Sequence, residues 1–313
     1  MGLRLGTRGS QLALAQAESV KNKLEAANTG LQVDVVKIRT SGDKGNREQL
    51  GAFVHEIQLA LIAGEIDIAL HCLKDIPTDP VPKLVIAAFL EREDARDAWI
   101  SKNGTIENLP PNSVVGTGSL RRTSQLRTMR SDLVFKKLEG NIDTRLQKLF
   151  DGEYQAIVLA IAGIKRLGLL DNWSNSPYRG LSIDLFQPET MVPATGQGIL
   201  VLEIRDDNDG AFLACSKLDH LNTRYCAYAE RAFLATFGGG CSVPVGAYAQ
   251  IRTGLIDLQG IVLSEDGKTR LYGLQTGNPK DASALGSKIA QNLGDRGGFE
   301  IVKAVLAKKA VQV

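Results

Sequence analysis

The stretch GLRLGTRGSQLALAQAESVKNKLEAANTGLQVDVVKI, residues 2–38, decides the fold of the first part of the chain. Its two ends, residues 3–6 and 31–38, alternate apolar and polar side chains, which predicts strands. Between them, apolar residues recur at helical spacing from Ala13 to Leu24, which predicts a helix. This order of strand, turn, helix and strand is typical of the βαβ unit, whose crossover is right-handed.

The same order of elements continues to residue 89 and then starts again. A helix is predicted over 50–61, and strands at 66–70 and 84–89. The junction Gly116-Thr117-Gly118-Ser119 matches Gly6-Thr7-Arg8-Gly9-Ser10, because both place Gly-Thr, a small turn and a serine between a strand and a helix. We therefore expect two α/β lobes of the same plan. The second lobe continues with predicted helices near 120–129, 141–150 and 162–167 and predicted strands at 133–138 and 156–159.

The pattern changes from about Asn208 onward. Two helical segments, 211–221 and 223–236, precede three stretches that alternate like strands at 245–250, 255–262 and 269–276. The short turns between these stretches, Arg252-Thr253-Gly254 and Asp266-Gly267-Lys268, have the spacing of hairpins and predict an antiparallel sheet. Helices predicted at 281–293 and 300–308 would cover one face of it, so this third domain is expected to be α+β.

The composition is that of an ordinary globular protein, with 43% hydrophobic and 23% charged residues in a chain of 313. At roughly 100–200 residues per domain, this length predicts two or three domains. The 37 Lys and Arg nearly balance the 35 Asp and Glu, and the net charge of +2 argues against nucleic-acid binding by bulk charge. The apolar stretches are far shorter than the ~18–20 residues of a membrane span, and the N-terminus lacks a signal-peptide pattern, so we expect a cytoplasmic protein with no membrane partner.

Cysteine and histidine spacing gives no support to a disulfide framework or a metal site. The four cysteines are unclustered and form no CxxC pair, and a reducing compartment favours free thiols. The three histidines show no ligand spacing with them, so no metal is expected. The residues concerned are Cys72, Cys215, Cys226, Cys241, His55, His71 and His220.

Arginines gather at the predicted turns between strands and helices. Arg8, Arg121 and Arg122 fall at such turns, where free backbone N–H groups and the helix dipole favour an anion. Arg145 and Arg166 lie on the next two helices of the second lobe. Because ligands of open α/β sheets bind at the carboxyl ends of the strands, converging guanidiniums there would suit carboxylates. The alternatives are solvent-exposed surface arginines or a phosphate ligand, although no GxxxxGK[ST] or GxGxxG motif supports a nucleotide.

Lys74-Asp75 follows the predicted buried strand 66–70, at the same functional edge. A carboxylate there, beside a lysine and near arginines, could stabilise a cation or hold an ammonium group. A helix N-cap or a surface ion pair explains the spacing equally well.

Cys241 directly follows Gly238-Gly239-Gly240, which predicts a thiol on a loop that allows close approach. Such a thiol is reactive when its thiolate is favoured. The chain offers no paired histidine for a hydrolase triad, so the thiol is better suited to be an attachment point than a turnover nucleophile. The other three cysteines fall in strand ends or helices and fit buried positions better.

These stretches together resemble the hydroxymethylbilane synthase (porphobilinogen deaminase) family along essentially the whole chain. The resemblance implies two α/β lobes like those of periplasmic anion-binding proteins, hinged around a cleft, and a third domain with the cysteine loop. The expected domains are 1–92 with 197–215, then 93–196, and finally 216–313. The matching motifs are TRGSQLAL at 7–14, LKDIP at 73–77, EREDARDA at 91–98, GTGSLRR at 116–122, GN at 140–141, TRL at 144–146, AGIKRLG at 162–168, PATGQG at 193–198, AERA at 229–232 and GGCSVPVG at 239–246.

The resemblance also implies a reaction. A dipyrromethane cofactor would be joined by a thioether to Cys241, and four porphobilinogen molecules would add head to tail with loss of ammonia before hydrolysis releases hydroxymethylbilane. Asp75 would be the catalytic residue that stabilises the cations and helps to protonate the leaving amine. Lys74, Ser119, Arg121 and Arg122 would bind the cofactor with Cys241. Substrate carboxylates would be held by Arg8, Ser10, Arg145, Arg166 and Gln197. We expect a monomer that takes porphobilinogen as its small-molecule partner.

The chain departs from the family pattern at three places. Glu48-Gln49-Leu50-Gly51 and His55 stand where the family usually has a Gly-Gly-Lys-Gly stretch and a second lysine, and Glu139 replaces the arginine of an Arg-Gly-Asn. We expect Glu139 to pair with a neighbouring arginine at the cleft edge, since an unpaired anion there would repel substrate carboxylates. The alternative function is an anion-binding module on the same two lobes with catalysis lost. Retention of both Asp75 and Cys241 favours the enzyme.

Overall fold

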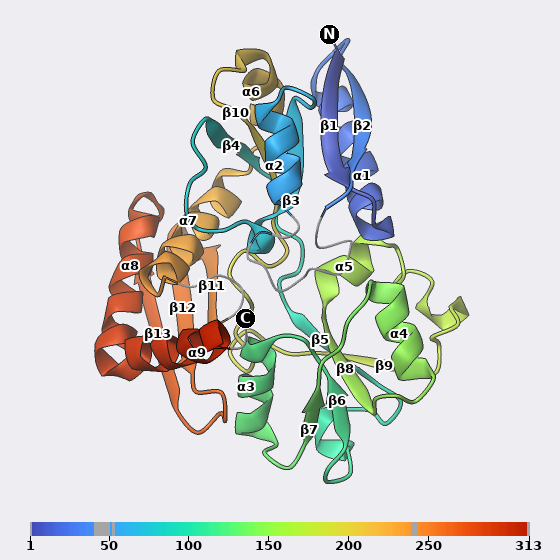
Figure 1. The fold of residues 1–313 in the computed structure, drawn as a ribbon, viewed down its shortest axis with the longest axis vertical. Helices are drawn as coiled ribbons and strands as arrows, with labels where there is room; N and C mark the ends of the chain where they lie inside the picture. The colour runs from blue at the N-terminus through green and yellow to red at the C-terminus, as the bar shows by residue number, and fades with distance from the viewer. Residues whose placement is uncertain (1, 41–50, 52–53, 239–242, 312–313) are drawn as a thin grey trace.

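The structure is a computed structural model that describes residues 2–40, 51, 54–238 and 243–311. The described residues form three β-sheets, two of five strands and one of three. Figure 1 shows the first lobe at the top, the second at the lower right and the third domain at the lower left. The mixed α/β architecture with two similar lobes and a small antiparallel domain confirms the predicted fold class.

The first lobe is built on a mixed sheet with the strand order β2-β1-β3-β10-β4. Strand β1 is parallel to β2 and β3, whereas β10 is antiparallel to β3 and β4. Its strands are β1 (Gly2–Arg8), β2 (Gln32–Ile38), β3 (Ile68–Cys72), β4 (Leu84–Phe89) and β10 (Leu200–Arg205), and its helices are α1 (Gln11–Ala27), α2 (His55–Ile62) and α6 (Asp209–Ser216). The predicted βαβ unit is therefore confirmed as β1, α1 and β2.

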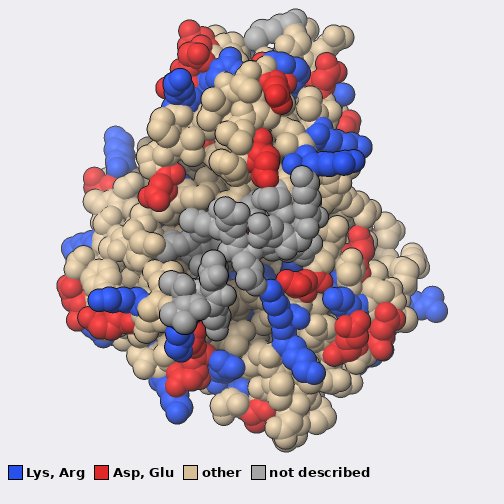
Figure 2. All heavy atoms as spheres, in the orientation of Figure 1, with Lys and Arg blue, Asp and Glu red and all other residues tan. Residues whose placement is uncertain are grey.

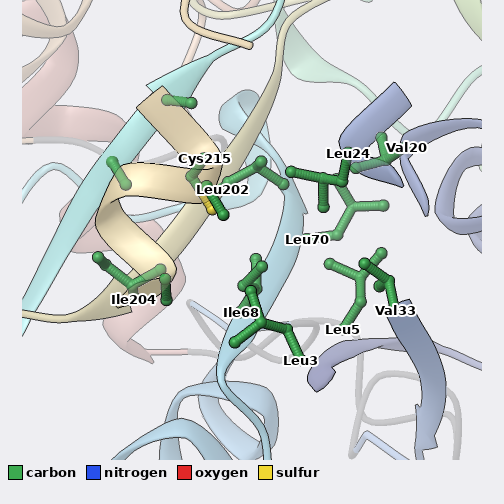
Figure 3. Close-up of a cluster of buried hydrophobic side chains, with 14 of the residues drawn as sticks. Leu3, Leu5, Val20, Leu24, Val33, Ile68, Leu70, Leu202, Ile204 and Cys215 are labelled. Atoms are coloured by element: carbon green, nitrogen blue, oxygen red, sulfur yellow. The ribbon is translucent and has the colours of Figure 1, made fainter. Parts of the chain in front are cut away.

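Apolar side chains on alternate positions of these strands explain why the lobe folds. Leu3 and Leu5 of β1 and Ile68 and Leu70 of β3 point to the same core, which Figure 3 shows with Leu24 of α1. Helix α6 also contributes a buried cysteine to this core, so it belongs with the first lobe by packing.

The second lobe repeats the plan with the strand order β7-β6-β8-β5-β9. Again the first three strands run parallel, and β5 runs antiparallel to both its neighbours. The strands are β5 (Asp97–Ser101), β6 (Val114–Gly116), β7 (Val134–Lys136), β8 (Ala156–Ala160) and β9 (Ser182–Leu185), and the helices are α3 (Leu120–Met129), α4 (Ile142–Phe150) and α5 (Ile161–Arg166). The repeated strand order confirms two lobes of one plan.

In each lobe, the strand that runs antiparallel to its neighbours comes directly after the last strand of a segment of the other lobe. Strand β5 comes after β4, and β10 comes after β9, so the chain crosses between the sheets through residues 90–96 and 186–199. The lobes also touch where α1 meets α5. There Gly163 packs so closely that a Cβ on it would lie 2.7 Å from Ile142 Cδ1 and 3.5 Å from Leu12 Cδ2 of the first lobe.

The third sheet is the antiparallel meander β11-β12-β13. Its strands are β11 (Val245–Arg252), β12 (Leu255–Leu263) and β13 (Arg270–Gly277), and its helices are α7 (Leu221–Thr236), α8 (Ala282–Leu293) and α9 (Phe299–Val311). One hydrophobic core holds residues of all three helices and of β11 and β12, with Leu271 of β13 packed against it. The hairpin turns at Thr253-Gly254 and Gly267 have positive φ, which is typical of tight turns between antiparallel strands.

Among the described residues, Cys72, Cys215 and Cys226 are free thiols, which agrees with the expectation for those three. Cys241 lies outside the described residues. No helix of the described chain has the length and apolar character needed to cross a membrane. Figure 2 shows basic and acidic side chains interspersed over the face it presents, in line with the balanced net charge.

Candidate functional site

Lys74 and Asp75 lie at the carboxyl end of β3, on the short 3₁₀-helix η1 (Leu73–Asp75). Leu73 and Ile76 on either side are buried in one hydrophobic cluster, so the chain is anchored before and after the two charged residues. Both charged side chains are half-buried, and within the described part of the chain neither makes a hydrogen bond or a salt bridge. Asp75 therefore serves there neither as a helix cap nor in a surface ion pair, and its carboxylate is available to a ligand.

The thiol of Cys72, the last residue of β3, marks where charged groups of both lobes converge. Burial raises the pKa of Cys72, the charge of Asp75 raises it further, and the charges of Arg166 and Lys74 oppose this rise. Arg166 is the last residue of α5, so a cation of the second lobe acts on a strand end of the first. Its Nη2 donates to the carbonyl oxygen of Gly198 at 2.6 Å, which orients the guanidinium.

Arg8 and Ser10 lie at the end of the neighbouring strand. Strands β1 and β3 are parallel, with Gly6 opposite Ala69, so their carboxyl ends meet at one sheet edge. Ser10 is the N-cap of α1, and its Oγ accepts a hydrogen bond from the backbone N–H of Ala13 at 3.3 Å. The N-cap bond starts the helix directly after the strand, which places the turn beside the Asp75 segment.

A buried carboxylate, Asp97, engages the two consecutive arginines of the second lobe. Nη2 of Arg121 donates to Oδ2 of Asp97 at 2.7 Å, and Nε and Nη2 of Arg122 donate to Oδ1 at 3.0 and 2.7 Å. The remaining bonds go to backbone carbonyls, from Arg121 to Val192 at 2.6 Å and from Arg122 to Val158 at 2.9 Å. The arginines are only 3% and 8% exposed, and Asp97 is fully buried.

Gln197 completes this cluster from the second crossing segment. Its Nε2 donates to Oδ1 of Asp97 at 2.9 Å and to the carbonyl of Ala95 at 2.6 Å, and the side chain is 1% exposed. Burial by itself would raise the pKa of Asp97, but the charges of Arg121 and Arg122 and the hydrogen bonds hold it well below its usual range.

Arg121 and Arg122, which are expected at a turn that binds a ligand, share Asp97 as a salt-bridge partner, and their contact with a ligand stays a prediction. Both guanidiniums are turned into the lobe, because Asp97 supplies the anion that two buried cations require. Gln197 likewise reaches Asp97 instead of an open surface. Sequence reasoning missed Asp97, although an aspartate that opens the apolar strand β5 is a signal that a buried charge needs a partner.

One buried nitrogen of the cluster makes no hydrogen bond within the described residues. Within the part of the chain that the structure describes, the buried Nε of Arg121 has no hydrogen-bond partner. A guanidinium has five N–H donors, and the bonds of Arg121 to Asp97 and Val192 use two of them. The arginine therefore keeps capacity for a further acceptor.

Ser119 and Arg145 stand at the carboxyl edge of the second sheet. Ser119 is the N-cap of α3, and its Oγ accepts from the backbone N–H of Arg122 at 3.4 Å. Arg145 lies in the first half of α4, where its Nε donates to the carbonyl of Gly140 at 2.8 Å. Both residues are half-buried, at the sheet edge expected from the sequence.

Glu139 forms a salt bridge with a lysine, and its expected pairing with a neighbouring arginine stays a prediction. Its carboxylate lies 3.0 Å from Nζ of Lys137, and both side chains are more than half exposed. Arg121, one of the arginines expected nearby, has Asp97 as its salt-bridge partner.

No group of three or more His, Cys, Asp or Glu side chains in the described ranges could hold a metal ion. The charged groups of the site are the half-buried carboxylate of Asp75 and several cations at the edges of the two sheets. Such a set suits a ligand that carries both carboxylates and a positive charge. Leu50 and the cysteine loop fall outside the described residues.

Comparisons with known proteins match this chain over nearly its full length. A family model described as "Porphobilinogen deaminase, dipyromethane cofactor binding domain" matches residues 3–212, and one described as "Porphobilinogen deaminase, C-terminal domain" matches residues 224–295. A porphobilinogen deaminase of Syntrophomonas wolfei is 40% identical over 307 residues, with 96% of this chain and 97% of the relative covered. One from Roseiflexus sp. (strain RS-1) is 43% identical over 303 residues, covering 95% and 97%.

Solved structures that match part of this chain are distant from it in sequence. The periplasmic VFT2 domain of Bordetella pertussis BvgS has a TM-score of 0.43 and 12% identity, with 69% of this chain and 86% of that chain covered. The periplasmic sulfonate-binding protein SsuA of a putative sulfonate ABC transporter from Methylobacillus flagellatus KT has a TM-score of 0.40 and 14% identity, with 74% of this chain and 68% of that chain covered.

Proposed function

The chain belongs to the porphobilinogen deaminase family, and from this premise we propose that it is the transferase that condenses four porphobilinogen molecules into the linear tetrapyrrole hydroxymethylbilane. The observation that carries the proposal is the uncommitted carboxylate of Asp75 at the end of β3, among the charges of Lys74 and Arg166. Porphobilinogen has carboxylates for the cations and an amine for the carboxylate. One site can therefore orient both ends of the substrate.

We assign the chemistry to Asp75. Its negative charge stabilises the positive charge that develops as the amine leaves porphobilinogen, and the same carboxyl group can pass a proton to that amine. Because Leu73 and Ile76 anchor the segment, the carboxylate is held in place before the substrate arrives. Such preorganisation is the usual source of electrostatic stabilisation in enzymes.

We assign Arg8, Ser10, Arg145 and Arg166 to the substrate carboxylates. Arg8 and Ser10 come from the edge of the first sheet, and Arg145 and Arg166 from the edge of the second. Two bonds from one guanidinium can fix a carboxylate in orientation as well as in place. Gln197 contributes through Asp97, which it holds by a hydrogen bond.

The residues present fit a dipyrromethane cofactor. The buried Nε of Arg121 has no hydrogen-bond partner in the described chain, which leaves a donor for an acceptor of the cofactor. Lys74 and Ser119, with the remaining N–H groups of Arg121 and Arg122, would hold its carboxylates, and Cys241 would carry the thioether. When bound, the cofactor supplies the pyrrole carbon to which the first substrate unit is joined. Tethering keeps the growing end within reach of Asp75 in every round.

The finer predictions complete the proposal. The domains are taken as 1–92 with 197–215, 93–196 and 216–313, and the working unit as a monomer in the cytoplasm. These statements stay predictions, and size-exclusion chromatography with light scattering would test the monomer.

The mass of the intact purified protein tests the function. Protein made in a host with intact porphobilinogen supply should carry one dipyrromethane, and peptide mapping should locate it on Cys241. The matched control is Cys226→Ser, which removes a buried thiol of α7 and should keep the added mass. An unmodified Cys241, or an adduct on Cys72, would contradict the proposal. Unmodified protein that still binds porphobilinogen would favour the anion-binding module.

A further inference from the structure

Helix α7 joins the third domain to the first lobe through one stripe of its surface. The stripe consists of Arg224, Ala227, Tyr228 and Arg231, which helical spacing places on one face. The Arg224 guanidinium lies 5.0 Å from the centroid of the Phe89 ring, and the rings of Tyr228 and Phe89 meet edge to face at 5.6 Å. Figure 1 shows α7 between α8 and the lobe that contains β4.

At the C-terminal end of this stripe, Arg231 holds the segment that follows Asp75. Its Nη1 donates to the carbonyl of Ile76 at 3.2 Å, and its Nη2 donates to the carbonyls of Pro77 at 2.8 Å and Thr78 at 3.4 Å. Successive carbonyls of one turn thus converge on a single guanidinium. The forked shape of arginine makes this possible, whereas lysine presents one point charge.

Arg231 forms no salt bridge with another described residue. Within the described chain, no carboxylate lies in salt-bridge contact with it. Burial lowers the pKa of Arg231, and the more distant charge of Glu203 only opposes this shift. A half-buried cation that serves backbone carbonyls alone is expensive to keep for stability, so its position calls for another reason.

The same segment is also held by apolar packing. Ala227 of α7 shares a hydrophobic cluster with Leu73 and Ile76, the residues that flank Lys74-Asp75. Leu73 in turn packs on Gly196, where a Cβ would lie 2.9 Å from the Leu73 Cγ. The chain around Asp75 therefore contacts both α7 and the second crossing segment.

The neighbouring residue, Glu230, fixes α7 to the crossing segments. Its fully buried carboxylate accepts hydrogen bonds from Arg92 at 2.5 Å, from the backbone N–H of Gly196 at 2.7 Å and from that of Ala249 at 2.7 Å. Two consecutive residues of the AERA motif thus tie one helix to the interlobe connection and to the Asp75 segment. Ten residues after Arg231 the sequence reaches Cys241.

We propose that Arg231 is a positioning residue for the reaction. Its hydrogen bonds to the carbonyls of Ile76, Pro77 and Thr78 hold the carboxylate of Asp75 at a fixed position relative to the third domain. The proposal rests on the proposed function, because it takes Asp75 as the catalytic group. Arg231 itself touches no reacting atom. Its loss lets the segment move by a small distance, and misplacement by about 1 Å can cost on the order of 100-fold in rate.

The test compares Arg231→Gln and Arg231→Lys with Arg224→Gln, a control that removes a cation of the same stripe away from Asp75. For Arg231→Gln we expect kcat to fall about 10- to 100-fold with KM within about twofold, and for Arg231→Lys an intermediate fall. Hydrogen–deuterium exchange in the peptide spanning residues 73–79 should accelerate in Arg231→Gln but not in Arg224→Gln. Guanidinium ion added to Arg231→Ala should restore part of the rate.

Three results would overturn the proposal. These are an equal loss of kcat in Arg231→Gln and Arg224→Gln, unchanged exchange in the 73–79 peptide, and a change confined to KM. If Arg231→Gln does not fold, the comparison of Arg231→Lys with Arg224→Lys decides in the same way. An inactive parent enzyme without a cofactor mass would instead refute the proposed function, so the two failures are distinguishable.

Discussion

Replacing Asp97 with asparagine is expected to destabilise the second lobe strongly, because this residue neutralises two buried arginines. Its Oδ1 accepts hydrogen bonds from Arg122 and Gln197, and its Oδ2 accepts one from Arg121. The asparagine side chain would keep an oxygen toward one side only, and its amide would then place N–H groups against the donors on the other side. Both guanidiniums, 3% and 8% exposed, would also lose their only salt-bridge partner in the described chain.

The size of the effect follows from the burial of this cluster. Removing one partner of a buried ion pair costs about 3–5 kcal/mol, because the other charge stays buried without compensation. Since domains are stable by about 5–15 kcal/mol in total, this loss should be a large part of the free energy of unfolding. The pKa of Asp97 is held below its usual range, so this contribution is fully present at pH 7 and is lost only as the pH falls below about 4.

Urea unfolding at pH 7, followed by tryptophan fluorescence, measures the change. Trp99 is buried on the same strand, two residues from Asp97, and reports on this lobe. The control is Asp132→Asn, which breaks the more exposed Arg130–Asp132 pair at 2.7 Å and should lower the free energy of unfolding far less, because solvent screens an exposed ion pair. If Asp97→Asn costs no more than the control, the view that Asp97 neutralises two buried cations is wrong.

Three further outcomes follow from the site and the crossing segments. Asp75→Asn should lower kcat by about 10²–10³-fold. The melting temperature should change little, because the Asp75 side chain has no partner in the described chain. Steady-state assays and calorimetry measure the two effects, and a near-parental rate would refute the catalytic role of Asp75. Burial opposes ionisation of Asp94, but hydrogen bonds from Arg96 and the charges of Arg96 and Lys165 lower its pKa to about 2. The stability that the ionised carboxylate contributes is present above about pH 4 and should be lost as the pH falls toward 2. Asp94→Asn should therefore make the free energy of unfolding less dependent on pH over that range, and an unchanged pH dependence would contradict this role of Asp94. Gly198→Ala should lower the free energy of unfolding by more than the roughly 1–2 kcal/mol that a left-handed backbone conformation costs, because its Cβ would lie 2.3 Å from the Glu93 carbonyl oxygen. The control is Gly152→Ala, since Gly152 has φ +87° and open space around it. Equal losses of stability in urea unfolding would show that the contact with Glu93 relaxes freely.

The sequence by itself determines the single helices, strands and hairpins of this protein. Alternation at residues 31–38 and helical spacing from Ala13 to Leu24 predict β2 and α1, because each element must bury one face of fixed period. The position of Lys74-Asp75 at a sheet edge also follows locally, since the pair comes directly after a short buried strand. The hairpins of the third domain are predicted for the same reason, from turns that only a few residue types accept.

Long-range partners were decided by the tertiary structure alone. The insertion of β10 between β3 and β4 depends on pairing across more than a hundred residues, and no local period encodes which edge a strand joins. The sequence predicts Arg121 and Arg122 at a turn between a strand and a helix, but their partner Asp97, 24 and 25 residues away, is visible only in the folded structure. In the same way Arg231 meets the Asp75 segment from about 155 residues further along the chain. A buried charge takes the partner that the packing brings to it, and packing is a property of the whole fold.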